Sequence, residues 1–262
     1  MTRPVALVTG ASGGIGEAIA HVLAEEGEDL VLVARSEAGL ERVAAAIRAR
    51  TDRAVLVLAL DLERRDAADV LRARLAQEGL TVRHLVNNAG YGLCGEVAEL
   101  PREGQLGMID LNCRALTDLT VTFLPEILAT GGGVLNVASV AGFVPGPGMA
   151  GYYASKAYVV SLTRALAFEL RDRGVKVSAL CPGPTPTGFG ARAGYRGSRA
   201  MALTRPLDPM LVARIGVAGY RKGKLVVVPG WRNRLIVALL AVLPHALVLP
   251  MLAKAQRQRR VR

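Results

Sequence analysis

The segment Thr9-Gly10-Ala11-Ser12-Gly13-Gly14-Ile15-Gly16 follows directly after the apolar run Val5 to Val8 and leads into the helical spacing of Ile15 to Glu26. A β-branched run, a glycine-rich turn and a helical stretch in this order predict a strand, a tight turn and a helix. Free N–H groups and the dipole at the start of such a helix bind pyrophosphate, and glycines let the phosphates approach the backbone. We therefore predict that Gly10, Ser12, Gly13, Gly14, Ile15 and Gly16 bind a dinucleotide.

The same residues also spell G-x-S-x-G around Ser12, the pattern of the nucleophile elbow in α/β-hydrolases. That elbow needs several strands and an oxyanion-hole loop before it, whereas here the glycine turn follows the first predicted strand. No convincing Asp-then-His pair follows it either. We therefore assign the Ser12 hydroxyl to the phosphates of a cofactor and not to nucleophilic catalysis.

Outward from this turn, short apolar runs alternate with helical stretches such as Gly39 to Arg50. Seven runs have the length and composition of buried strands: Val5 to Val8, Leu30 to Ala34, Val55 to Leu60, Leu85 to Asn87, Val134 to Ala138, Val175 to Leu180 and Leu225 to Val228. Strands separated by helices join through right-handed crossovers and form a parallel sheet. The expected fold is therefore α/β: a single-domain, Rossmann-like, doubly wound parallel sheet of about seven strands with helices on both faces.

The residues after the second predicted strand indicate which dinucleotide binds. In dinucleotide-binding folds an acid near this point usually holds the ribose 2′-OH. Here the strand ends in Ala34 and continues as Arg35 and Ser36, so no acid is available. A guanidinium pairs bidentately with a 2′-phosphate and stacks on adenine. We therefore predict NADP(H) in preference to NAD(H), with Ser36 as a second donor beside Arg35.

A proton-transfer group is expected in the helical stretch Tyr153 to Arg173 and just before it. Tyr152 and Lys156 lie four residues apart, which places both side chains on one helix face. A free tyrosine has a pKa of about 10, and a neighbouring ammonium stabilises the phenolate and lowers that pKa. Ser139 follows the fifth predicted strand, where the carboxyl ends of strands meet the cofactor crevice. We predict that Tyr152 transfers the proton, Lys156 supports it electrostatically and Ser139 binds the substrate oxygen.

Together these residues resemble the short-chain dehydrogenase/reductase family over nearly the whole chain, up to about Pro229. The resemblance identifies further cofactor contacts by their match to the family's motifs. They are Asp61 and Leu62 in the adenine pocket, Asn88, Ala89 and Gly90 in the Asn-Asn-Ala-Gly element, and Pro182, Gly183, Thr185 and Thr187 in the Pro-Gly segment, the last near the nicotinamide carboxamide or the pyrophosphate.

The resemblance also implies a catalytic set of Asn112, Ser139, Tyr152 and Lys156. In the family's mechanism, hydride moves between the nicotinamide and the substrate carbon while Tyr152 exchanges a proton with the oxygen that Ser139 polarises. Lys156 and Tyr152 also bind the cofactor, Lys156 through its ribose, and Asn112 holds a water that replaces the proton. This chemistry needs no metal, in agreement with a sequence that has no ligand cluster of metal-site spacing.

The activity that the resemblance implies is NADP(H)-dependent reduction of a small-molecule ketone or aldehyde, expected to be hydrophobic or lipid-like, to an alcohol. The alternative is a non-catalytic NADP(H)-binding sensor or scaffold protein at a membrane surface, which the intact Ser139, Tyr152 and Lys156 argue against. The family's usual pairing implies a homo-oligomer, a dimer or a tetramer, with Gln105 to Leu128 and Tyr153 to Arg173 at the dimer face.

We divide the chain into residues 1–230, an NADP(H)-binding Rossmann-like reductase domain that includes a substrate loop at 183–224, and residues 231–262, a basic and apolar C-terminal extension. Within the extension, Leu235 to Ala253 has nearly the length of a membrane-spanning helix, but Pro244 and Pro250 interrupt it. Two short helices on an acidic membrane surface are one interpretation. Packing on the domain itself or on a second subunit, over the substrate cleft, is the other.

Charge is distributed unevenly along the chain. From Phe189 to Arg262 there are fifteen Lys or Arg residues and a single acid, Asp208, within a net charge of +11. This asymmetry favours an anionic partner such as a membrane surface, whereas no motif supports nucleic-acid binding. Without a secretory signal pattern after Met1, we expect a cytoplasmic protein, with peripheral contact at the inner membrane face as an open alternative. Cys94, Cys113 and Cys181 are expected to be reduced structural thiols.

Overall fold

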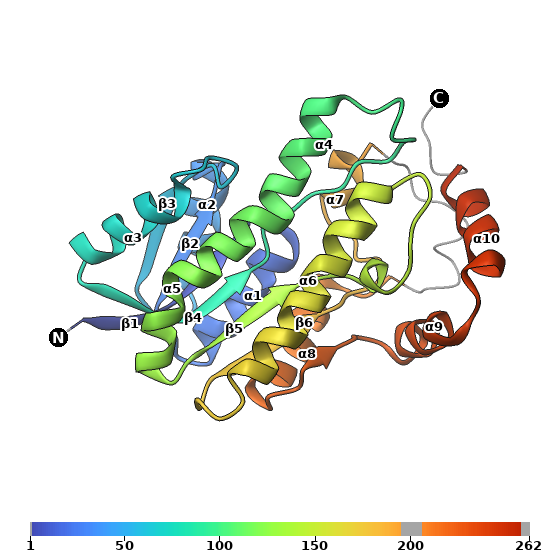
Figure 1. The fold of residues 1–262 in the computed structure, drawn as a ribbon. Helices are drawn as coiled ribbons and strands as arrows, with labels where there is room; N and C mark the ends of the chain where they lie inside the picture. The colour runs from blue at the N-terminus through green and yellow to red at the C-terminus, as the bar shows by residue number, and fades with distance from the viewer. Residues whose placement is uncertain (1, 195–205, 258–262) are drawn as a thin grey trace.

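A seven-stranded sheet forms the centre of the computed structural model, which describes residues 2–194 and 206–257 (Figure 1). All pairs are parallel, and the strand order is β3-β2-β1-β4-β5-β6-β7. The strands are β1 (Arg3–Thr9), β2 (Leu30–Ala34), β3 (Val55–Ala59), β4 (Leu80–Asn87), β5 (Gly133–Val137), β6 (Lys176–Leu180) and β7 (Val226–Val227). The predicted doubly wound parallel sheet is confirmed, and each predicted run contains or overlaps one strand.

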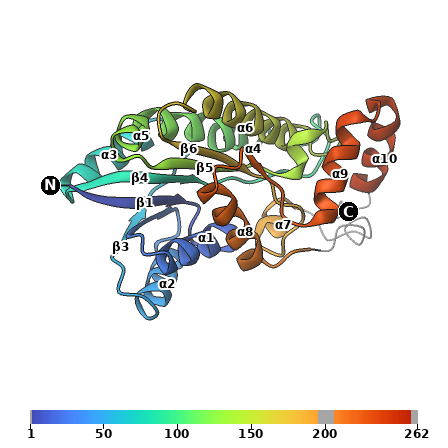
Figure 2. The same cartoon turned by 90° about the horizontal axis from the view of Figure 1, so that it is seen from below.

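Helices cover both faces of the sheet, as Figure 2 shows edge-on. One layer holds α1 (Gly14–Glu25), α2 (Glu37–Arg48) and α8 (Pro209–Arg221). The other holds α3 (Ala67–Gln77), α5 (Leu116–Thr130) and α6 (Ala150–Glu169), with α4 (Arg102–Ile109) running through the π-helical turn η1 (Asp110–Ala115) into α5. Because the strands are buried on both sides, they read as continuous apolar runs in the sequence.

The order of the strands determines where a ligand can bind. From β1 the chain winds outward to β3, then returns to the other side of β1 as β4 and winds outward again to β7. The loops after β1 and β4 therefore diverge to opposite sides at the carboxyl ends of neighbouring strands. This switch point leaves a crevice, and it is the usual ligand site of open α/β sheets.

The expected substrate loop at 183–224 needs a correction, because α8 occupies much of it. Asp208 caps this helix by accepting hydrogen bonds at Oδ1 from the N–H groups of Met210 and Leu211, and Pro209 occupies its first position. One face of α8 is buried in the core against α1 and β6. The helical segment is thus part of the domain core, and among the described residues of 183–208 the short helix α7 (Phe189–Arg192) interrupts the loop as well.

The C-terminal extension forms two helices, α9 (Trp231–Val242) and α10 (His245–Arg257), at one end of the molecule (Figures 1 and 2). The break between them falls at Pro244, one of the two prolines that argued against a single helix. Within residues 2–194 and 206–257, no helix has both the length and the apolar character to cross a bilayer. The inward side of α9 packs against the short 3-10 turn η2 (Val140–Phe143), directly after Ser139.

Candidate active site

The glycine turn forms a cradle that only glycine can build. Gly10 and Gly14 adopt φ angles of +64° and +61°, which L side chains rarely adopt. A Cβ atom on Gly10 would lie 2.8 Å from Nδ2 of Asn88, and one on Gly16 would overlap the carbonyl oxygen of Gly10. The turn therefore presents bare backbone at the start of α1, the arrangement that a dinucleotide pyrophosphate requires.

Asn88 holds this turn in place from the neighbouring strand. Its Nδ2 donates to the carbonyl oxygens of Thr9 at 2.8 Å and Gly10 at 3.1 Å. In return, Oγ1 of Thr9 accepts the N–H groups of Asn88 and Ala89 at 2.9 and 3.1 Å. The side chain of Asn88 thus fixes the shape of the glycine turn through the backbone of Thr9 and Gly10.

Arg35, Ser36 and Ser12 border one corner of the crevice at the end of β2. The Arg35 side chain is 52% exposed, with Nη1 3.9 Å from Oε1 of Glu63. Ser36 caps α2 by accepting the N–H of Gly39 at 3.1 Å, and a Cβ atom on Gly39 would lie 3.0 Å from Cβ of Ser12. A guanidinium and two hydroxyls therefore meet where the ribose end of a dinucleotide would lie.

Sequence reasoning missed Arg42, which binds the glycine turn from α2. Its guanidinium forms a bidentate pair with Glu17 at 2.7 and 2.8 Å and donates to the carbonyl oxygen of Ser12 at 3.2 Å. The hydrogen bond and charge of Arg42 hold the pKa of Glu17 below its ordinary value. No local pattern marks Arg42, because its partners lie 25 and 30 residues away along the chain.

The other end of the crevice holds Tyr152 and Lys156, on the first turns of α6. The Lys156 side chain is buried, and its Nζ donates to the carbonyl oxygen of Val137 at 2.8 Å and lies 6.0 Å from the ring centre of Tyr152. Burial lowers the pKa of Lys156 from 10.5 to about 8, so the ammonium is still the dominant form at neutral pH. A cation is thus held beside the phenol, as the spacing of these residues predicted.

Ser139 lies at the end of β5 and begins η2. Its Oγ accepts the N–H of Ala141 at 3.1 Å, an N-cap contact that fixes the side chain. The hydroxyl keeps its own hydrogen, which can be donated to a substrate oxygen. The next residue is tied to the segment after β6 by a hydrogen bond from the N–H of Val140 to the carbonyl oxygen of Pro182 at 3.0 Å. The strand ends therefore position Ser139 and the Pro-Gly segment together.

Asn112 is buried in η1 and links the crevice to α6. Its Oδ1 accepts the N–H of Tyr91 at 3.1 Å, and its Nδ2 donates to the carbonyl oxygen of Tyr91 at 2.9 Å and to Oγ of Ser155 at 3.0 Å. Ser155 in turn donates to the carbonyl oxygen of Tyr152 at 2.7 Å. The Asn112 side chain therefore joins the backbone at Tyr91 to α6 beside Tyr152. π-Helical turns of this kind are frequent at functional sites.

Thr185 and Thr187 belong to the segment that crosses the crevice after β6. Oγ1 of Thr185 donates to the carbonyl oxygen of Gly183 at 3.1 Å, and Oγ1 of Thr187 accepts the N–H of Phe189 at 3.3 Å. Cγ2 of Thr187 lies 3.1 Å from the position of a Cβ atom on Gly14. Thr187 therefore lies over the glycine turn.

The short helix α7 packs against Tyr152. The Phe189 ring lies 5.2 Å from that of Tyr152, and a Cβ atom on Gly92 would meet Phe189, Met149 and Tyr152 at 2.9–3.1 Å. The N–H of Cys94 donates to the carbonyl oxygen of Ala193 at 3.0 Å, which ties α7 to the loop after β4. Apolar side chains of Phe189 and Met149 therefore lie beside Tyr152.

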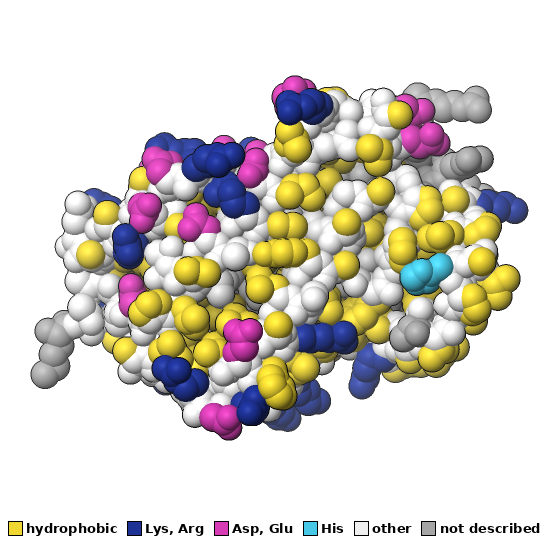
Figure 3. Space-filling view, viewed as in Figure 1, with side chains coloured by type: hydrophobic (Ala, Val, Ile, Leu, Met, Phe, Trp, Pro, Cys, Tyr) yellow, Lys and Arg dark blue, Asp and Glu magenta, His cyan; other side chains and the backbone are white. Residues whose placement is uncertain are grey.

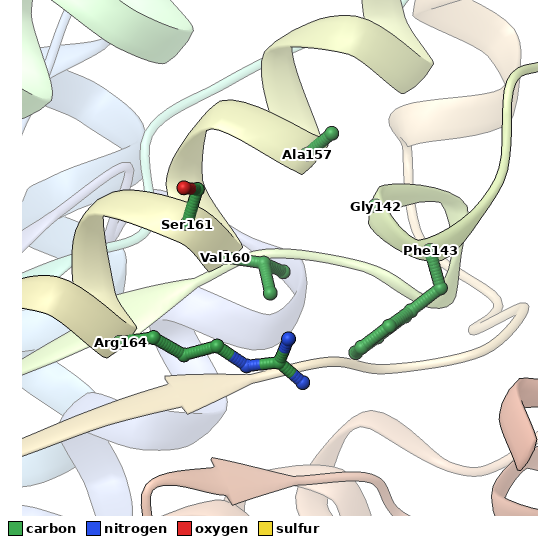
Figure 4. Close-up of a pocket in the computed structure, with 6 residues that line it drawn as sticks. All are labelled: Gly142, Phe143, Ala157, Val160, Ser161 and Arg164. Atoms are coloured by element: carbon green, nitrogen blue, oxygen red, sulfur yellow. The ribbon is translucent and has the colours of Figure 1, made fainter. Parts of the chain in front are cut away.

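Two further features lie near the site and were not expected from the sequence. Asn233 on α9 is buried with its amide against Gly183, where a Cβ atom would lie 2.5–2.8 Å from it, and its Nδ2 donates to the carbonyl oxygen of Pro229 at 2.8 Å. A hollow of about 350 Å³ between η2 and α6 contains none of the expected site residues (Figure 4). Its lining is Gly142, Phe143, Ala157, Val160, Ser161 and Arg164.

Residues 4–195 match the family described as short chain dehydrogenase. The chain belongs to the short-chain dehydrogenase family. It is 37% identical to a sulfoacetaldehyde reductase of Chromohalobacter salexigens over 185 residues, which cover 70% of this chain and 72% of the relative. The protein is therefore an oxidoreductase, and the family resemblance predicted from its motifs is confirmed.

Solved structures of similar proteins agree with this assignment. A short-chain dehydrogenase from Sphingobium yanoikuyae in complex with NADPH has a TM-score of 0.79 and 32% identity, and the match covers 93% of this chain and 97% of that one. A 3-ketoacyl-(acyl-carrier-protein) reductase from Brucella melitensis in complex with NADH has a TM-score of 0.77 and 30% identity, with coverage of 88% and 98%. These similarities support a nicotinamide cofactor for this short-chain dehydrogenase.

Proposed function

We propose that this short-chain dehydrogenase uses NADP(H) to reduce an apolar ketone or aldehyde to an alcohol. One observation supports the proposal above all others. Ser139, Tyr152 and Lys156 lie at the end of the crevice that begins at the glycine cradle, with the Lys156 ammonium 6.0 Å from the Tyr152 ring. A non-catalytic NADP(H)-binding sensor would not need to keep a buried cation beside a phenol.

In the proposed reaction each side chain has a separate part. A nicotinamide held in the crevice would supply the hydride that the carbonyl carbon accepts. Ser139 donates its hydroxyl hydrogen to the carbonyl oxygen and orients it, while Tyr152 gives that oxygen its proton. Lys156, held by the carbonyl oxygen of Val137, keeps positive charge near the phenolate that remains, which stabilises it. Asn112 keeps the surrounding backbone rigid through its three hydrogen bonds.

Preference for NADP(H) rests on the corner formed by Arg35, Ser36 and Ser12. A 2′-phosphate placed there gains a charge-assisted bond from the guanidinium, whereas the positions directly after β2, where an acid usually holds the ribose 2′-OH, are Arg35 and Ser36. Oε1 of Glu63 lies 3.9 Å from Nη1 of Arg35, too far for a hydrogen bond. The guanidinium therefore keeps its N–H donors for a phosphate. We expect Arg35→Ala to weaken NADPH binding about tenfold or more and to leave NADH binding within about twofold.

An apolar substrate is proposed from the apolar side chains beside Tyr152. Met149 is buried beside Gly92 and Tyr152, and the Phe189 ring lies 5.2 Å from the tyrosine ring. The reductase from Brucella melitensis is named for a 3-ketoacyl substrate and the relative from Chromohalobacter salexigens for sulfoacetaldehyde. The first is an acyl chain and the second a small anion, and the apolar side chains beside Tyr152 are complementary to the acyl chain.

The test is NADPH oxidation by the purified protein with ketones and aldehydes graded by chain length and polarity. We expect turnover to rise with apolar surface, to be lost in Tyr152→Phe and to persist in Tyr153→Phe, its neighbour on the same helix. NADPH binding by Tyr152→Phe should stay within about twofold, because the phenol oxygen acts in proton transfer. Equal activity on small polar ketones would refute the apolar substrate, and tight NADPH binding without any turnover would favour the sensor.

We also propose a cytoplasmic enzyme that touches an anionic membrane through residues 231–262. Support comes from the fifteen Lys or Arg residues and single acid between Phe189 and Arg262. Basic segments of this kind are attracted to anionic lipid surfaces by about 1 kcal/mol per charge.

Homo-oligomerisation through α5 and α6 is proposed from the family's usual pairing, and Val121 and Phe168 on these helices are 67% and 68% exposed.

A further inference from the structure

The outward face of α9 carries a continuous apolar stripe. At about 100° per residue, Trp231, Leu235, Leu239 and Val242 fall within an arc of about 80° on the helix. Their exposed fractions are 66%, 52%, 48% and 77%. Figure 3 shows hydrophobic side chains gathered over this end of the molecule. Large apolar side chains exposed in a row mark an interaction surface, whereas single ones need no explanation.

Two arginines flank this stripe, one on each side. Arg232 follows Trp231 by about 100° around the helix, and Arg234 lies about 60° beyond the opposite edge. Both residues are exposed, and Arg232 lies 5.3 Å from the Trp231 ring. Guanidinium groups at the borders of an apolar face are placed to meet phosphate groups while the apolar residues enter a bilayer.

Helix α10 repeats the pattern. Leu247 and Met251 are 63% and 73% exposed, and Lys254, which lies about 60° from Met251 around the helix, is exposed as well. Val248, which lies about 60° from Met251 on the side away from Lys254, is 5% exposed, so the covered part of α10 borders this exposed arc. Both helices of the extension therefore expose large apolar side chains next to basic ones.

The inward side of α9 is fastened to the active site. Asn233 lies on that side, with its amide against Gly183 and its Nδ2 bonded to the carbonyl oxygen of Pro229. Gly183 begins the segment that carries Thr187 over the glycine cradle, and α9 also packs against η2, which follows Ser139. A surface bound by α9 would consequently lie beside the substrate end of the crevice.

We infer that α9 and α10 form a docking platform for an anionic lipid surface, from which a membrane-dissolved carbonyl substrate enters the crevice. A lipid surface fits better than a second copy of the chain, because a symmetric contact would bring the basic borders of both stripes together. From Phe189 onward only Asp208 could neutralise them. The part of the inference that concerns substrate entry rests on the proposed reduction of an apolar carbonyl compound.

The experiment is co-sedimentation of the full chain with vesicles of phosphatidylcholine, with and without phosphatidylglycerol. We expect binding only to the anionic vesicles and at least a tenfold loss in the double variant Leu235→Glu, Leu239→Glu. The matched control is Val70→Glu with Leu211→Glu, at residues that are 41% and 46% exposed on α3 and α8. This control should bind vesicles like the wild type.

Kinetics separate this inference from the proposed function. With a long-chain ketone dissolved in anionic vesicles, we expect kcat/KM to fall about tenfold in the Leu235→Glu, Leu239→Glu variant. Its turnover of a water-soluble ketone and its NADPH binding should match the wild type. Wild-type protein that stays in the supernatant, or a variant that sediments equally, overturns the platform. The platform is also overturned if the wild type is a dimer, the variant is a monomer and neither binds vesicles. Absence of turnover on every ketone speaks instead against the proposed function, since sedimentation needs no catalysis.

Discussion

Replacement of the buried lysine by methionine should stabilise the folded protein while it abolishes catalysis. In the native state, burial lowers the pKa of Lys156 from 10.5 to about 8. This difference corresponds to about 3 kcal/mol of unfavourable free energy for keeping the ammonium buried at neutral pH. Lys156→Met removes the charge but leaves the carbonyl oxygen of Val137 without its donor, at a cost of about 1 kcal/mol. The variant should be more stable by about 2 kcal/mol at pH 7.

The sign of the pH dependence follows from the direction of the shift. Below about pH 8 the native and unfolded states of the wild type both carry the proton, so the penalty is fully present. Between about 8 and 10.5 the native state has lost the proton and the unfolded state has kept it, so the stability of the wild type rises with pH. Above this window the variant loses its advantage and is less stable by about 1 kcal/mol, the missing hydrogen bond.

Urea unfolding at pH 7 and pH 10.5, followed by far-UV circular dichroism without added nucleotide, measures this difference. Lys222→Met, at an exposed lysine on the other side of the sheet, is the control and should leave the midpoint nearly unchanged at both pH values. The comparison of variant with wild type removes the titration of other groups. A variant that is less stable than the wild type at pH 7, or a difference that does not change with pH, would refute the reasoning.

Two further changes test contacts outside the reacting groups. Gly183→Ala would press a methyl group against the Asn233 amide, so we expect a loss of about 1–3 kcal/mol in thermal unfolding and weaker NADPH binding. Gly188→Ala, where nothing lies within 4 Å, is its control and should change neither. Arg221→Met would leave the Glu28 carboxylate, 13% exposed, without the guanidinium that now lies 2.7 Å away. We expect a loss of about 3 kcal/mol in urea unfolding, and an unchanged midpoint would contradict a stabilising ion pair.

Much of the fold could be predicted because its signals are local. Parallel strands buried on both faces read as unbroken apolar runs, and the glycine turn stands directly between β1 and α1. Tyr152 and Lys156 were predicted together because a helix brings residues four apart onto one face. The predicted substrate loop was too long because it included α8. The glycines and prolines before this helix indicated a loop, whereas the Asp208-Pro209 cap and the apolar face that follows indicate a helix.

Other parts of the site could not be predicted, because their partners are distant in the chain. Arg42 binds the glycine turn from 30 residues away, and Asn88 reaches back 79 residues to Thr9. Only the tertiary structure shows which face of α9 is covered, because that face packs against Gly183 and η2. An isolated helical pattern does not show which side a protein covers and which it leaves to a partner.

The amino-acid sequence by itself therefore determined the strands of the sheet, the glycine turn after β1 and the pairing of Tyr152 with Lys156 on one helix face, since each depends on residues close together in the chain. Tertiary structure alone decided the lowered pKa of Lys156, the filled hydrogen bonds of the Asn112 side chain and the outward apolar face of the extension. Desolvation, hydrogen-bond saturation and exposure depend on what the folded chain packs around a group, and residues far apart in sequence supply that packing.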